Sequence, residues 1–83
     1  MVAILSAFVS AAMHEARYRF LEDGSIYGEI PSCPGVWANE GSLEKCREVL
    51  QEVLEEWLLL KLKDGDPLPR LGGIDLNVVG AGA

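Results

Sequence analysis

Histidine and cysteine are scarce in this chain. Its 83 residues include one histidine, His14, and two cysteines, Cys33 and Cys46. A structural zinc site needs about four nitrogen or sulfur ligands, and a disulfide framework needs several cysteine pairs. We therefore expect no metal, no cofactor and no catalytic group of the Ser/His/Asp or Cys/His type. Free thiols are typical of the reducing cytosol, so a cytoplasmic location is expected.

Positive charge is also in short supply. Seven lysines and arginines stand against thirteen acidic residues, which gives a formal net charge of −6. Non-specific nucleic-acid binding relies on cations that replace the counterions of the phosphates, and anionic membrane surfaces attract basic proteins. The composition therefore argues against both kinds of partner and favours a basic protein as partner.

The chain has no long apolar run. The uncharged stretch Met1 to Met13 is too short to span a bilayer as a helix. No lysine or arginine precedes it, although a secretory signal begins with positive charge. Apolar residues at helical spacing instead predict a short helix over residues 4–14. The alternative is a mis-assigned start, with Met13 as the first residue of the protein.

A meander of three strands is predicted over residues 16–39. Arg17 to Phe20 alternates polar and apolar residues, and Asp23-Gly24 is typical of a tight hairpin turn. A second strand follows at Ile26–Ile30, and its Gly28 indicates a close neighbour or a bulge. Pro31 to Gly35 predicts a turn, Val36 to Ala38 a short third strand, and Asn39 to Gly41 a loop.

A long helix is predicted over residues 43–63, with Ser42 as its N-cap and Asp64-Gly65 as its stop. Its expected apolar seam is Leu43, Cys46, Leu50, Val53, Trp57 and Leu60, widened by Val49, Leu54 and Leu58. A last strand is predicted over residues 74–79, where Ile74, Leu76 and Val78 alternate with polar residues. The sequence thus predicts one α+β domain over residues 1–83, with a small antiparallel sheet packed by one long helix.

Several motifs together resemble the HicB-like antitoxins. They are Tyr18 to Phe20, Glu22-Asp23-Gly24, Ile26 to Pro31, Pro34 to Ala38, the helix SLEKCREVLQEVLEEWLLLKL and Pro67-Leu68-Pro69. The resemblance implies a partial ribonuclease H-like fold. It also implies an antitoxin that neutralises a small basic HicA-like toxin, an mRNA interferase, by binding and masking it. Many members carry a C-terminal DNA-binding domain, for which the chain has no room after Ala83, so no direct DNA binding is expected.

Two sets of residues are candidates for protein contacts. Glutamates recur on the long helix, and Glu48, Glu52, Glu55 and Glu56 are predicted to meet the basic toxin. The simpler interpretation is a solvated helix face. Hydrophobic residues make up 49% of this small chain, which favours a homo-oligomer, either dimer or tetramer. Trp37, Ile74, Leu76 and Val78 are the predicted self-association residues, with ordinary core positions as the alternative.

Two further functions remain open at the level of sequence. One is a solitary homo-oligomeric regulatory or ligand-binding module without a toxin partner. The other is a metal-dependent nuclease, which the ribonuclease H-like resemblance suggests. Such an enzyme needs several carboxylates around two metal ions. Glu29 and Asp75 on strands and Glu22 and Asp23 in a turn do not form a convincing set, so we do not expect an enzyme.

Overall fold

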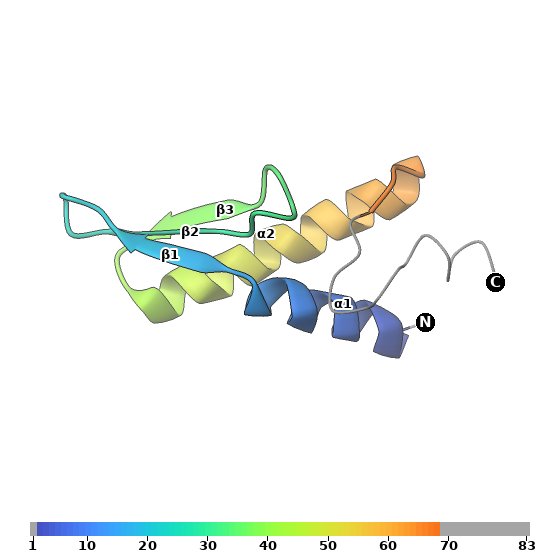
Figure 1. Cartoon of the computed structure of the whole chain (residues 1–83), viewed down its shortest axis with the longest axis horizontal. Coiled ribbons are helices and arrows are strands. Elements are labelled where there is room, and N and C mark those ends of the chain that lie inside the picture. The colour runs from blue at the N-terminus through green and yellow to red at the C-terminus, as the bar shows by residue number, and fades with distance from the viewer. Residues whose placement is uncertain (1, 69–83) are drawn as a thin grey trace.

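The computed structural model describes residues 2–68, which form a three-stranded antiparallel sheet and two helices. The elements run in the order α1 (Val2–His14), β1 (Arg17–Phe20), β2 (Ile26–Glu29), β3 (Trp37–Glu40) and α2 (Leu43–Asp64). The sheet has the strand order β1-β2-β3 and lies against α2, while α1 runs alongside the second half of α2 (Figure 1). This arrangement confirms the predicted α+β class, the short N-terminal helix and the long helix that packs on the sheet. The predicted strand over residues 74–79 lies outside the described residues.

Turn chemistry fixes the register of β1 against β2. Gly24 has a φ of 86°, and its N–H donates to the Leu21 carbonyl at 3.0 Å. The Asp23 carboxylate accepts from both the backbone N–H and the hydroxyl of Ser25, at 2.9 and 2.6 Å. These two hydrogen bonds lower the pKa of Asp23 because they favour its ionised form. The predicted Asp-Gly hairpin is therefore present, and it pairs Phe20 with Ile26.

The third strand begins and ends later than the sequence pattern predicted. Val36 precedes β3, and its carbonyl accepts from the N–H of Ile30 at 3.3 Å across the Pro31–Gly35 turn. Asn39 and Glu40 were predicted to lie in a loop, but both belong to β3, where Glu40 pairs with Ile26. The Asn39 side-chain amide donates to the Ser25 hydroxyl and to the Ile26 carbonyl, at 2.9 and 3.1 Å. Those two bonds hold the polar residue in the strand.

Helix α2 has the boundaries that its capping residues predict. The Ser42 hydroxyl accepts from the Lys45 N–H at 3.1 Å, and Gly65 ends the helix with a φ of 71°. The buried face of the helix, however, differs from the predicted seam. It consists of Cys46, Leu50, Leu54 and Leu58 at intervals of four, whereas Leu43 and Leu60 are about half exposed, at 48% and 56%. Both of these leucines therefore lie outside the core.

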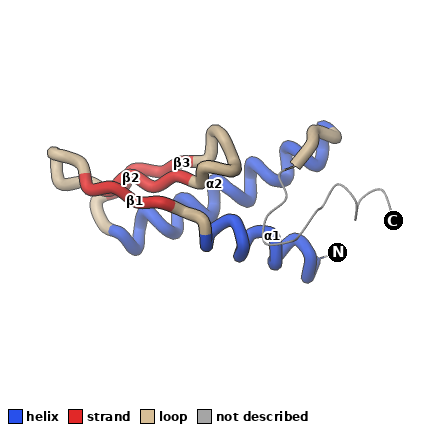
Figure 2. The backbone as a smooth tube through the Cα atoms, in the orientation of Figure 1, coloured by secondary structure: helices blue, strands red, loops and turns tan. Residues whose placement is uncertain are grey.

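The core lies between α2 and one face of the sheet, and α1 closes one end of it. Phe8 and Ala12 of α1 are fully buried, as are Leu50 and Leu54 of α2. Burying a leucine side chain of this size contributes about 1.5–3 kcal/mol. Figure 2 shows α2 running along the strands, with α1 beyond their end and beside α2. The opposite face of the sheet is covered by none of the described elements.

Candidate functional site

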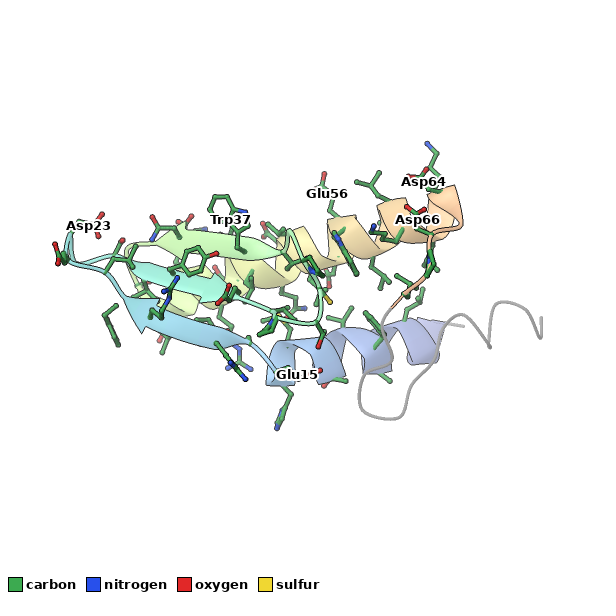
Figure 3. All side chains as sticks on the ribbon, turned by 45° about the horizontal axis from the view of Figure 1, so that its top comes forward. Glu15, Asp23, Trp37, Glu56, Asp64 and Asp66 are labelled. Carbon is green, nitrogen blue, oxygen red and sulfur yellow. The ribbon has the colours of Figure 1, made fainter. Side chains whose placement is uncertain are left out.

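Three glutamates form a row on the exposed side of α2, which we call the acidic stripe: Glu48, Glu52 and Glu56. All three are exposed, and their spacing of four residues places them on neighbouring turns. Lys45 lies 3.9 Å from Glu48, in an exposed pair that contributes little to stability. Figure 3 shows Glu56 projecting from α2 on the side away from α1. A basic surface that docked here would relieve the repulsion between these carboxylates.

The fourth predicted contact residue, Glu55, is adjacent to the acidic stripe, because it lies three residues after Glu52 on α2. It lines a groove of about 870 Å³ between α1 and α2. The side-chain amide of Gln51 donates to its carboxylate at 3.3 Å. The four predicted glutamates therefore share one side of α2, with Glu55 at the border between the acidic stripe and the groove. Whether they contact a toxin stays a prediction.

The groove combines apolar and polar walls. Leu5, Val9 and Met13 contribute to it from α1, and Leu58 and Leu59 contribute from α2. Its polar lining includes Ser6, Ser10, His14, Glu44, Arg47, Gln51 and Glu55. The Tyr18 side chain also borders it; burial raises the pKa of the Tyr18 hydroxyl, and the nearby Arg47 guanidinium opposes that shift.

The uncovered face of the sheet carries a stack of three side chains. The Arg19 guanidinium lies 5.0 Å from the centroid of the Tyr27 ring. The Tyr27 ring in turn stacks on that of Trp37, with centroids 6.0 Å apart and planes 20° from parallel. Trp37 is 54% exposed and points away from β3 (Figure 3). Tryptophan, tyrosine and arginine are the residues most enriched at the energetic centres of protein interfaces.

The structure describes only one of the four predicted self-association residues, Trp37. Trp37 is exposed, which rules out the ordinary core position that was its alternative. Ile74, Leu76 and Val78 lie outside the described residues. Self-association through Trp37 stays a prediction, but the residue is available for it. The stacking partners Tyr27 and Arg19 were missed, although their alternation with buried neighbours on β1 and β2 is the signal that could have placed them on this face.

Both cysteine thiols are buried and protonated near neutral pH. Burial and the neighbouring Glu15 carboxylate raise the pKa of Cys33 to about 11. Burial also raises the pKa of Cys46, whose thiol donates to the Ala38 carbonyl at 3.6 Å. A thiolate is the reactive form of cysteine, so neither residue is set up as a nucleophile. Within residues 2–68 no three His, Cys, Asp or Glu side chains converge as metal ligands, and no helix is long and apolar enough to cross a membrane.

Comparison with known proteins places this geometry in a family. A family model described as UPF0150-like matches residues 7–69. The crystal structure of TTHA0281 from Thermus thermophilus is similar, with 44% sequence identity and a TM-score of 0.82. That similarity covers 87% of this chain and 90% of the other chain. No curated protein matches significantly.

Proposed function

This chain belongs to the UPF0150-like family, and from that premise we propose that it is an antitoxin that binds and masks a small basic toxin. The partner is a HicA-type mRNA interferase, as the resemblance of the strand and helix motifs to HicB-like antitoxins implies. Neutralisation is stoichiometric: the antitoxin occupies the RNA-binding surface of the toxin and carries out no reaction of its own.

The observation that carries this proposal is the acidic stripe. Glu48, Glu52 and Glu56 are exposed on neighbouring turns of a 22-residue helix that spans roughly 33 Å. Among the described residues, only Lys45 forms an ion pair with a member of the stripe. The resulting row of carboxylates is complementary to the basic surface with which an RNA-binding toxin holds phosphates. It would speed association through electrostatic attraction and exclude RNA by like charge.

The proposal is tested with the native pair of proteins. The chain is co-expressed with any small basic protein that a reading frame next to its own gene encodes, and the mass of the purified complex is measured in solution. Binding is then measured across a range of salt concentrations for wild type and for Glu48→Lys/Glu52→Lys. We expect the double variant to bind at least about tenfold more weakly and to show a flatter salt dependence.

The matched control is Glu15→Lys/Glu22→Lys, which changes the net charge by the same amount. Both residues are exposed and lie outside α2: Glu15 follows α1, and Glu22 lies in the turn between β1 and β2. We expect this control to retain most of the affinity. Equal losses of affinity in the two variants would show that binding depends on the net charge of the chain and not on the acidic stripe. A failure of the wild-type chain to form the complex would favour a solitary homo-oligomeric module instead.

A further inference from the structure

The groove wall of α2 carries a sequence that is symmetric about its centre. Leu43, Arg47, Gln51, Glu55 and Leu59 follow one another at intervals of four residues, and all five line the groove. Residues at this interval form a continuous ridge on a helix. Arg47 and Glu55, which have opposite charges, lie four residues before and after Gln51. Leu43 and Leu59 lie eight residues before and after it.

The charged members of this ridge form no ion pair with another described residue. Among the described residues, the ion pairs are Lys45 with Glu48 and Lys61 with Asp66. Arg47 and Glu55 take part in neither, and both are exposed. The leucines at the two ends are also exposed, Leu43 at 48% and Leu59 at 64%. The ridge thus presents unpaired charge and apolar surface together.

We propose that a second copy of this chain docks on the groove face, with a two-fold axis passing near Gln51. The two α2 helices then cross in antiparallel sense. Four residues rise about 6 Å along a helix, so Arg47 and Glu55 lie equally far from the axis. Arg47 of each copy therefore faces Glu55 of the other, and the two Gln51 amides meet at the centre.

The same geometry covers the apolar surface of the groove. A two-fold interface requires a patch that is complementary to itself, and the ridge meets this requirement in both charge and hydrophobicity. The facing wall of α1 adds Ser6 and Ser10, and no residue from Val2 to Met13 is charged. A copy therefore approaches without repulsion from α1, despite the net charge of −6. A basic partner gains less here, because Arg47 offsets one of the two carboxylates, Glu44 and Glu55, that line the groove.

This inference concerns the purified chain alone and needs no toxin, so it can fail independently of the proposed function. Sedimentation equilibrium of the wild-type chain should give a mass twice that of the 9.0 kDa chain. Arg47→Glu places two carboxylates opposite each other at two symmetric positions, and Glu55→Arg places two guanidinium groups there. We expect each single variant to raise the dissociation constant of the dimer at least about tenfold.

The double variant Arg47→Glu/Glu55→Arg decides the register. It exchanges the two charges and should restore the dissociation constant to within about threefold of wild type, because each pair is re-formed with reversed sign. Lys45→Glu and Asp64→Arg are the matched controls, since they make similar charge changes on α2 outside the groove; both should dimerise normally. Circular dichroism confirms that each variant is folded. A monomeric wild type, unaffected single variants or a folded double variant that stays monomeric would each overturn the proposal.

Discussion

Gly28 and Tyr18 are paired across β1 and β2, and the Tyr18 ring occupies the space that a side chain at Gly28 would need. A Cβ atom at Gly28 would lie 2.9 Å from Cε1 of Tyr18 and 3.1 Å from the sulfur of Cys46. The first of these distances is shorter than real Cβ atoms tolerate, and the second is tight. The glycine therefore allows the tyrosine and α2 to approach the sheet closely, and this brings Tyr18 to the edge of the groove.

Gly28→Ala should therefore destabilise the protein. The Tyr18 ring or α2 must shift to admit the methyl group, at a cost of about 1–3 kcal/mol in the free energy of unfolding. Urea denaturation followed by circular dichroism measures this difference. Gly41→Ala is the matched control, because a Cβ atom there meets nothing within 4 Å, and its stability should be close to that of wild type. Equal stability of the two variants would contradict the close approach.

Local signals in the sequence were enough to predict most of the fold. Capping by Ser42 and Gly65 and the tight turn at Asp23-Gly24 depend on residues within a few positions of each other. Such short-range chemistry is visible in the sequence. The hydrogen bonds that place Asn39 in β3 come from Ser25 and Ile26, more than ten residues away. No local pattern contains them, and the segment was consequently predicted as a loop.

The binding surfaces were harder to predict, because they depend on how the helix lies against the sheet. Apolar residues that are spaced alternately three and four residues apart form a seam parallel to the helix axis. The buried residues from Cys46 to Leu58 are instead spaced four residues apart, so their row slants around the helix. That slant leaves Leu43 exposed and brings Glu55 to the wall of the groove. The symmetric order of Arg47, Gln51 and Glu55 was present in the sequence. Only the fold shows that all three residues line one groove.

Trp37 is the residue through which we expect dimers to associate further. It lies on the uncovered face of the sheet, opposite α2, with its ring stacked on Tyr27. Trp37→Ala should leave the dimer intact and reduce the population of tetramers at high protein concentration, as measured by sedimentation velocity. Leu60→Ala is the control, because Leu60 is exposed to a similar degree, 56%, on α2. Identical mass distributions for wild type and Trp37→Ala would show that the sheet face takes no part in self-association.

The raised pKa of Cys33 predicts a loss of stability in alkali. The folded protein holds the thiol proton up to a pKa of about 11, whereas the ordinary pKa of the thiol is 9.0. Between these two values the unfolded chain binds fewer protons than the native protein, so the free energy of unfolding falls as the pH rises. Below the lower value both states are protonated and the contribution is fully present. Urea denaturation at pH 8, 9 and 10 measures the slope.

Cys33→Ala isolates this contribution from those of the other groups that titrate in the same range, Tyr18 and Cys46 among them. The variant loses packing at every pH, because Cys33 is fully buried. It gains in return, because its unfolded chain has no thiol at this position that ionises as the pH rises. The stability difference between wild type and Cys33→Ala should therefore shrink from pH 8 to pH 10. A difference that stays constant across this range would show that burial does not hold the proton on Cys33.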